Sequence, residues 1–263
     1  MKRDIRVMLV EDDLYARDLM SLLLRRDWRT QVVAETGDLG AIPGLLAKTR
    51  VDVALLDSEY PTDPQWSSRI GKAMLDMKQL PVVIVTGTQP DAQTLDSLKA
   101  PIFSGYLLKS EIAYSLAWAV TLAVDGAWVI TPRVEALADS VGFTFPRKPV
   151  VLDGRTTVTG LTAREAEIAR LAILFNLPRR DLADELTKSP ATIFESVSQV
   201  YQKLGLWDIL DGEVDPASYF AGHDLVLRHF KESLVDIWPE TKGRKGRDKD
   251  TLAFHLLTIP EVR

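Results

Sequence analysis

The sequence predicts a doubly wound α/β domain followed by an all-α domain. Within residues 1–125, five apolar segments alternate with helical patterns, which is the signature of a parallel sheet with helices on both faces. Beyond residue 160, apolar residues recur at helical spacing behind capping residues. We therefore divide the chain into an α/β domain at 1–125, a linker at 126–160, a helical domain at 161–208 and a mainly helical extension at 209–263.

The composition is that of a soluble protein with room for two cores. The chain has 263 residues, of which 46% are hydrophobic and 26% charged, with a formal net charge of −5. It contains no cysteine, which excludes disulfide scaffolds and thiolate metal sites and suits a reducing cytoplasm. The first apolar segment is too short for a signal peptide or a membrane span, so we expect a cytoplasmic protein without a membrane partner.

The five predicted strands are short apolar runs. They span residues 5–10, 31–35, 51–57, 81–87 and 102–108. Helices are expected after Asp13 and at 41–48, 69–78, 91–99 and 112–124. The first of these helices is expected to supply its apolar face from Leu14, Leu19 and Leu23. This order predicts a five-stranded parallel sheet.

Polar side chains stand at the carboxyl ends of four predicted strands. They are Glu11 and Asp12, Asp57, Thr86, and Lys109. Such ends can converge on one crevice, where crowded carboxylates repel one another unless a cation lies between them. Mg²⁺ favours carboxylate and water oxygens, while a lysine and a threonine can contact a phosphoryl group. Each residue alone is equally consistent with an ordinary turn, but together they predict a Mg²⁺-dependent phosphoryl site.

Residues 1–125 resemble the receiver domain of bacterial two-component response regulators, which has a flavodoxin-like fold. The matching segments are Val10-Glu11-Asp12-Asp13, Leu56-Asp57-x-x-Pro61, Val85-Thr86-Gly87 and Gly105-Tyr106-Leu-Leu-Lys109. The resemblance implies that Asp57 accepts a phosphoryl group from a histidine kinase, and that Thr86 and Lys109 contact the phosphoryl oxygens.

The same resemblance implies a set of Mg²⁺ ligands and a switch residue. The ligands would be Asp12, Asp57 and the backbone carbonyl of Glu59, with Glu11 in the outer shell. Tyr106 would follow Thr86 inward when the domain switches. Tyr60 and Ser110 depart from the usual residues at their positions, but neither belongs to the phosphoryl chemistry.

The helix expected at 112–124 is apolar almost all round. One stripe should pack on the sheet, and a second should face outward, formed by Tyr114, Trp118 and Leu122. Either the linker covers this second stripe, or the stripe docks the second domain or a second subunit.

Helix-start signals recur between residues 161 and 206. Thr162 and Glu165 fit a capping box, a second helix follows Pro178, and Ser189-Pro190 fits the start of a third. This stretch resembles a LuxR-type helix-turn-helix domain. In the preceding linker, the apolar and threonine-rich pieces after residue 139 could form a small hairpin.

The resemblance is weakest where DNA would be contacted. Recognition helices read bases with the exposed residues near their start, while lysine and arginine hold phosphates. The candidate DNA contacts are Arg179, Arg180, Lys188, Thr192, Phe194 and Gln199. Phe194 stands where the family usually has a lysine, Glu195 would repel phosphates, and residues 161–208 carry six basic and seven acidic side chains. We therefore expect DNA binding to be weak, unusual or lost.

The extension at 209–263 goes beyond the family pattern. It contains an amphipathic helix pattern at 216–238, a glycine-spaced basic loop at 242–249 and an apolar segment at 252–259 that fits a helix or a strand. The basic loop is either a solvated turn or an arm that contacts the DNA backbone.

These features support two hypotheses of different kinds. The leading one is a transcriptional response regulator that is phosphorylated on Asp57 and acts on DNA as a homodimer. The alternative is a phosphorylation-gated protein-interaction module whose helix-turn-helix no longer binds DNA. An enzyme as the main role is not expected, because the sequence shows no nucleophile–base arrangement, nucleotide loop or metal-hydrolase spacing.

Overall fold

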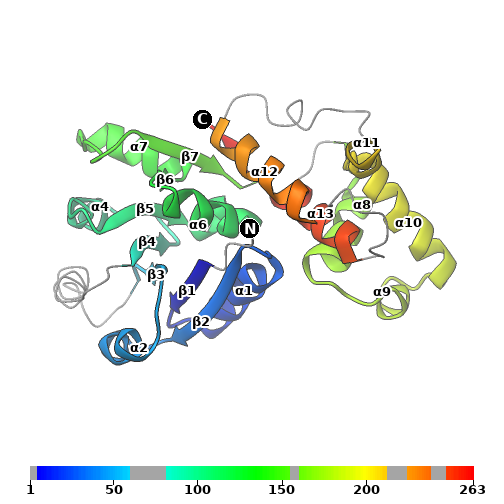
Figure 1. The fold of residues 1–263 in the computed structure, drawn as a ribbon, viewed down its shortest axis with the longest axis horizontal. Coiled ribbons are helices and arrows are strands. Elements are labelled where there is room, and N and C mark those ends of the chain that lie inside the picture. The colour runs from blue at the N-terminus through cyan, green and yellow to red at the C-terminus, as the bar shows by residue number, and fades with distance from the viewer. Residues whose placement is uncertain (1–4, 60–80, 155–159, 212–223, 238–246) are drawn as a thin grey trace. The chain divides into compact units, whose positions relative to one another are not determined.

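The chain folds into two compact units, which we treat separately (Figure 1). The computed structural model describes residues 5–59, 81–154, 160–211, 224–237 and 247–263. The α/β unit comprises Lys2–Gly154 together with Pro260–Arg263, and the helical unit comprises Arg155–Ile259. The helix expected at 69–78 lies outside the described residues.

The α/β unit is built on one sheet of eight strands, which is three more than the five strands that we predicted. The strands are β1 (Ile5–Val10), β2 (Thr30–Thr36), β3 (Val53–Asp57), β4 (Val82–Gly87), β5 (Phe103–Leu108), β6 (Trp128–Ile130), β7 (Pro149–Asp153) and β8 (Glu261–Val262). Their order is β2-β1-β3-β4-β5-β6-β7-β8. All neighbouring pairs are parallel except β7 with β8, which is antiparallel. The first five strands are those that the sequence predicts.

Residues 128–153 belong to the sheet, although we expected this stretch to be part of a linker. Trp128, Val129 and Ile130 are fully buried in β6, and β7 pairs in parallel with β6 instead of forming a hairpin. A three-residue strand is too short to show a period, which is why the sequence pattern does not reveal it. Gly126, with φ +92°, makes the turn into β6, and Pro132 begins the helix that follows.

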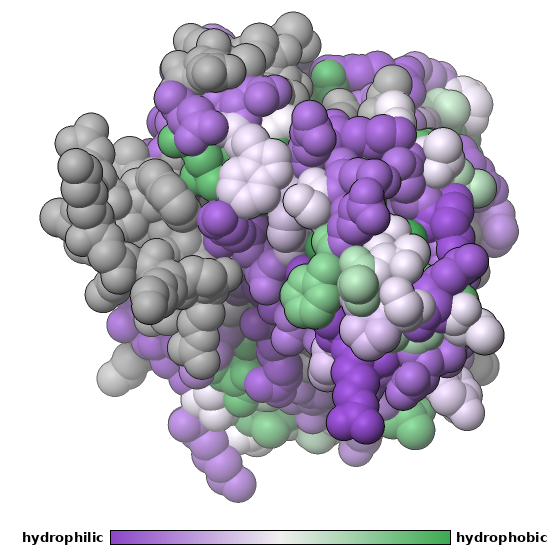
Figure 2. All heavy atoms as spheres, turned by 90° about the vertical axis from the view of Figure 1, so that its right-hand side faces the viewer, coloured by the Kyte–Doolittle hydropathy of each residue, from purple (hydrophilic) through white to green (hydrophobic). Residues whose placement is uncertain are grey.

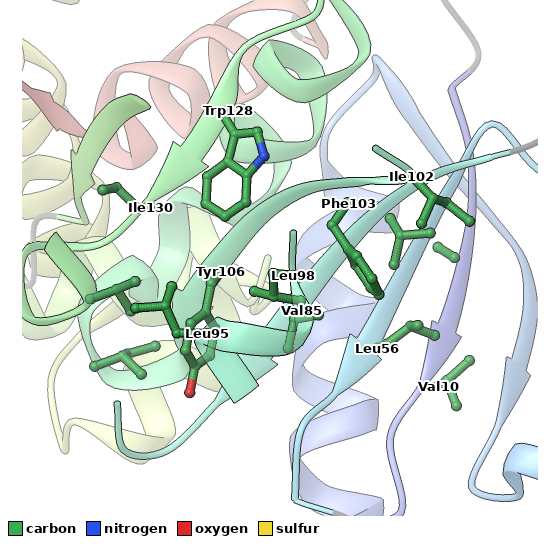
Figure 3. Close-up of a cluster of buried hydrophobic side chains, with 14 of the residues drawn as sticks. Val10, Leu56, Val85, Leu95, Leu98, Ile102, Phe103, Tyr106, Trp128 and Ile130 are labelled. Carbon is green, nitrogen blue, oxygen red and sulfur yellow. The ribbon is translucent and has the colours of Figure 1, made fainter. Parts of the chain in front are cut away.

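Helices cover both faces of this sheet. They are α1 (Leu14–Arg26), α2 (Ile42–Lys48), α4 (Ala92–Ser97), α5 (Lys109–Ile112), α6 (Leu116–Val124) and α7 (Pro132–Val141). On one face, α2, α4 and α7 pack on a buried cluster of strand side chains that runs from β1 to β7 (Figure 3). Tyr106 and Trp128 belong to this cluster. Helices α1 and α6 contact each other and lie outside the cluster, with α6 packed on β4 and β6.

One expectation about a helix face was wrong, and the alternatives left open for another are narrowed. In α1, Leu23 is buried but Leu14 and Leu19 are exposed. In α6, Trp118 and Leu122 are fully buried, so that this stripe is covered and not open to solvent. The guanidinium carbon of Arg29 lies 4.0 Å from the centre of the Trp118 ring, which adds a cation–π contact to that burial.

The helical unit begins with the three helices that the caps predict. Its elements are α8 (Ala163–Ala169), a π-helical turn (Arg170–Leu174), α9 (Arg179–Glu185), α10 (Pro190–Lys203), α11 (Leu206–Leu210), α12 (Asp224–Ile237) and α13 (Arg247–Thr258). The capping box of Thr162 and Glu165 is formed, and Ser189 caps α10 by accepting a hydrogen bond from the backbone nitrogen of Thr192.

The core of this unit draws on both the three-helix segment and the extension. The predicted stripe of α10 is buried, namely Ile193, Val197, Val200 and Leu204. Helix α13 contacts the π-helical turn and α11, and buries Leu252, Ala253 and Phe254. Among the described helices, none combines the length and the apolar character that crossing a membrane requires.

The close approach of β6 to β5 depends on Gly105, which leads to our first prediction. A Cβ atom at Gly105 would lie 2.5 Å from the carbonyl oxygen of Val129. We expect Gly105→Ala to lower the free energy of unfolding by about 1–3 kcal/mol, because the two strands must separate. Gly44→Ala is the control, since a Cβ there meets nothing within 4 Å and should stabilise α2 by up to about 1 kcal/mol. Urea denaturation of the two variants measures both effects, and equal stabilities would contradict the prediction.

Candidate functional site

The carboxyl ends of β1, β3, β4 and β5 bring the predicted phosphoryl-site residues to one edge of the sheet. Glu11 directly follows β1, Asp57 ends β3, and Lys109 directly follows β5. Thr86 of β4 pairs in register with Asp57. Glu11, Asp12 and Asp57 each offer a carboxylate oxygen, and these three oxygens lie within 4.8 Å of one another.

Lys109 joins the two buried carboxylates of this cluster. Its Nζ lies 2.7 Å from Oε2 of Glu11 and 3.1 Å from Oδ1 of Asp57. Burial raises the pKa of Glu11 to about 7 and also raises the pKa of Asp57, although Lys109 acts in the opposite direction on both. Burial tends to lower the pKa of Lys109, but the two carboxylates outweigh this effect and raise it.

The donor set of this cluster fits a small, hard divalent cation. Glu11 and Asp57 are almost completely buried, whereas Asp12 is exposed. Oε2 of Glu11 and Oδ1 of Asp57 accept no hydrogen bond from the described residues in addition to their ion pair with Lys109. Because buried carboxylates are costly without compensation, a cation bound by these oxygens would relieve their repulsion. Oxygen ligands of this kind are those that Mg²⁺ prefers.

The third acid of the motif, Asp13, has a structural role. Its side chain caps α1 by accepting a hydrogen bond from the backbone nitrogen of Ala16 at 2.9 Å. Nearby, Nη1 of Arg17 donates to the backbone carbonyl of Glu11 at 2.5 Å. The sequence reasoning missed Arg17, since an arginine in a first helical turn carries no distinguishing pattern.

The side chain of Glu59, two residues after Asp57, holds the loop after β4. Oε1 of Glu59 accepts a hydrogen bond from the backbone nitrogen of Thr88 at 2.9 Å and a second one from its hydroxyl group. The Thr86 hydroxyl is buried and lies 3.5 Å from the backbone carbonyl of Leu56. The assignment of the Glu59 backbone carbonyl as a metal ligand stays a prediction.

Tyr106, the predicted switch residue, is fully buried in β5 (Figure 3). Its hydroxyl donates to the backbone carbonyl of Gln89 at 3.0 Å and accepts from the backbone nitrogen of Asp91 at 3.2 Å. Burial raises its pKa to about 12, so it stays a neutral donor at physiological pH. Tyr106 therefore fastens the loop between β4 and α4 to β5.

Most of the candidate DNA contacts lie exposed in the helical unit. Arg180, Lys188, Thr192, Phe194 and Gln199 are exposed, with Phe194 at 59%. The side of the molecule turned to the viewer in Figure 2 is mostly hydrophilic, with isolated apolar side chains. Helix α10 packs against both α8 and α9, which is the arrangement of a helix-turn-helix.

Arg179 differs from the other candidates because residues of the same unit already engage it. Its Nη2 donates to the Tyr201 hydroxyl at 3.1 Å and lies 3.8 Å from Oδ1 of Asp250, on α13. Tyr201 itself donates to Asp250. Similarly, Nζ of Lys249 lies 4.2 Å from the centre of the Trp207 ring. The sequence could not reveal these contacts, because they join segments about fifty residues apart.

Comparison with known proteins finds a relative among transcriptional regulatory proteins. No protein-family model matches the chain. It is 27% identical over 210 residues to the uncharacterized transcriptional regulatory protein YxjL of Bacillus subtilis (strain 168), covering 79% of this chain and 92% of the relative. Over most of its length, this chain is therefore similar to a bacterial transcriptional regulatory protein.

Solved structures similar to this chain include two response regulators. The response regulator ChrA of a heme-sensing two-component system is 28% identical, with 77% of this chain and 91% of that chain covered and a TM-score of 0.42. A LuxR-family response regulator from Aurantimonas sp. SI85-9A1 is 23% identical, with 54% of this chain and 99% of that chain covered and a TM-score of 0.47.

The position of Tyr106 in this chain leads to our second prediction. Tyr106→Phe keeps the ring in the core but removes the hydroxyl that holds Gln89 and Asp91. We expect the free energy of unfolding to fall by about 0.5–1.5 kcal/mol and amide exchange to quicken at residues 88–91. Tyr15→Phe is the control, because Tyr15 is 86% exposed and its change should have no measurable effect. Unchanged exchange at 88–91 would contradict the role given to Tyr106.

Proposed function

We propose that this chain is a response regulator, switched by phosphorylation of Asp57 in the presence of Mg²⁺, and that it controls transcription through its helix-turn-helix. The observation that carries this proposal is the position of the Lys109 ammonium group between Asp57 and Glu11 at the carboxyl edge of the sheet. An isolated turn acid would not be buried beside a second carboxylate and a lysine that compensates both.

The transfer itself requires an oxygen nucleophile and a phosphorylated histidine of a kinase. A carboxylate oxygen of Asp57 forms a bond to phosphorus while the bond between phosphorus and the imidazole nitrogen breaks, and the histidine takes up a proton. Lys109 lies where it can neutralise charge on the transferred group, and Thr86 lies beside Asp57 as a hydroxyl donor. Asp12, Asp57 and the backbone carbonyl of Glu59 would hold Mg²⁺, with Glu11 in the outer shell, and the ion would neutralise phosphoryl oxygens when bound.

The proposed DNA contacts come from α9, α10 and the turn between them. Arg180 and Lys188 are exposed cations suited to phosphates, whereas Thr192, Phe194 and Gln199 lie exposed on α10. Phe194 can contact a thymine methyl group. A basic contribution from residues 242–246 remains a prediction outside the described part of the chain, and a homodimer also remains a prediction.

One observation favours the alternative of a protein-binding output domain. Phe194 is a large apolar side chain at 59% exposure, and Glu195 beside it is also exposed. An anion and an aromatic ring suit a protein surface better than a phosphate backbone. If the phosphorylated regulator binds no DNA at low salt, this alternative replaces the DNA proposal.

Our third prediction tests the phosphoryl chemistry. Incubation of the full chain with acetyl phosphate and Mg²⁺ should add one phosphoryl group, detected by intact mass. Asp57→Asn should abolish the mass shift, and Asp12→Ala should abolish it through loss of the metal. Lys109→Ala should still be phosphorylated, but it should not undergo the conformational change that phosphorylation causes in the wild type. An unshifted wild-type mass under all conditions, or an equal shift in Asp57→Asn, would overturn the proposal.

Our fourth prediction concerns Arg179 and its partner Asp250. In the folded unit, the carboxylate of Asp250 competes with a DNA phosphate for Arg179. Asp250→Asn should therefore raise DNA affinity and steepen the salt dependence, where each added phosphate contact contributes a slope of about −0.9. Arg180→Ala should lower affinity in either background, whereas Arg179→Ala should lower it clearly only together with Asp250→Asn. Equal effects of Arg179→Ala in both backgrounds would contradict the competition.

A further inference from the structure

We infer that Glu111 and Arg133 form a relay that carries phosphorylation of Asp57 to Gly154, the residue at which the chain leaves the α/β unit. The relay rests on the proposed phosphorylation and deepens it, because it names the residues through which the state of the site reaches the output unit. Glu111 and Arg133 act through their neighbours, so they are positioning residues and take no part in phosphoryl transfer.

The first part of the relay is a set of three hydrogen bonds at the end of β5, around Lys109. The backbone nitrogen of Leu108 donates to Oγ1 of Thr131 at 3.1 Å. The carboxylate of Glu111 accepts from the backbone nitrogen of Arg133 at 3.1 Å, and its backbone carbonyl accepts from Gly154 at 2.7 Å. Residues 108–111 are thus tied to the start of α7 and to the end of β7.

The second part joins the same arginine to the loop after β4. Nη2 of Arg133 donates to the side-chain oxygen of Gln89, while the Tyr106 hydroxyl donates to the backbone carbonyl of Gln89 at 3.0 Å. Nε of Arg133 also lies 3.9 Å from the Glu111 carboxylate. Arg133 therefore contacts the loop that follows β4, the strand of Thr86, and also α5, the helix that begins with Lys109. Thr86 and Lys109 are the two groups proposed to bind the phosphoryl oxygens.

Gly154 makes the connection tight enough to transmit a small displacement. A Cβ atom at Gly154 would lie 2.0 Å from the carbonyl oxygen of Ile112 and 2.6 Å from that of Glu111. No other residue type can approach these carbonyls so closely. Because the helical unit begins at the next residue, a shift of residues 109–112 must move the point where the two units are joined.

The driving force is the added charge on Asp57. A phosphoryl group brings anionic oxygens to the site, so the Lys109 ammonium is drawn away from its present position between Glu11 and Asp57. Residues 109–112 follow Lys109, since they continue directly from it as α5. Packed elements change between discrete arrangements, so a small shift there is passed on through the hydrogen bonds of Glu111.

The experiment measures amide exchange of the full chain before and after phosphorylation with acetyl phosphate, with intact mass recorded on the same samples. In the wild type, exchange should change at 131–133 and 149–154 as well as at the ends of β4 and β5. Arg133→Ala should be phosphorylated to the wild-type extent but lose the change at 131–133 and part of the change at 149–154, because the hydrogen bond from Gly154 to the Glu111 carbonyl remains. Gly154→Ala should lose it too, because its Cβ forces the two segments apart.

Arg147→Ala is the matched control. Arg147 precedes β7 and donates hydrogen bonds to the carbonyl of Gly126 at 2.7 Å and to the hydroxyl of Ser104 at 3.1 Å. These bonds lie near the start of β5 and not near its end. It should keep the wild-type response. The relay is overturned if phosphorylated wild type shows no change at 149–154, or if Arg133→Ala and Gly154→Ala respond as Arg147→Ala does. An unshifted mass would instead overturn the proposed phosphorylation, and the relay with it.

Discussion

The α/β unit depends on one lysine that compensates two carboxylates almost completely removed from water. Without Lys109, the charges of Glu11 and Asp57 would lie close together in a poorly solvated place, and one of them would have to take up a proton. Both groups can therefore stay ionised together only while a cation lies between them. Any event that draws Lys109 away must supply another positive charge, such as a bound metal ion.

This constraint gives the end of β5 its importance, because Lys109 follows that strand directly. In a five-stranded sheet, β5 would be an edge, and its movement would be felt only by the helices beside it. Here β6, β7 and β8 make β5 an interior strand. Glu111 consequently accepts hydrogen bonds from the start of α7 and from Gly154, directly after β7, so more of the unit is hydrogen-bonded to the residues after Lys109 than the five-strand pattern implies.

The strands β7 and β8 lie next to the two points at which the chain changes from one unit to the other. β7 ends at Asp153, and the helical unit begins at Arg155. The helical unit ends at Ile259, and β8 begins at Glu261. Asp153 and Glu261 are register partners, and Val151 exchanges two backbone hydrogen bonds with Arg263. The helical unit is thus tethered at both its ends to one short antiparallel pair. Within that unit, α13 completes the core and supplies Asp250, whose carboxylate lies 3.8 Å from Nη2 of Arg179.

Local patterns in the sequence were sufficient for the strands β1 to β5, the caps of α8 and α10, and the gathering of Glu11, Asp57, Thr86 and Lys109. Each of these follows from short-range rules: apolar runs make strands, capping residues start helices, and parallel strands end at one edge. The tertiary structure alone decided that Trp118 is buried, that residues 128–153 extend the sheet, and that Asp250 meets Arg179. The physical reason is the same in each case. A three-residue strand, a buried aromatic ring beneath an arginine, and an ion pair between distant segments all draw their stability from partners far away along the chain, which no local pattern encodes.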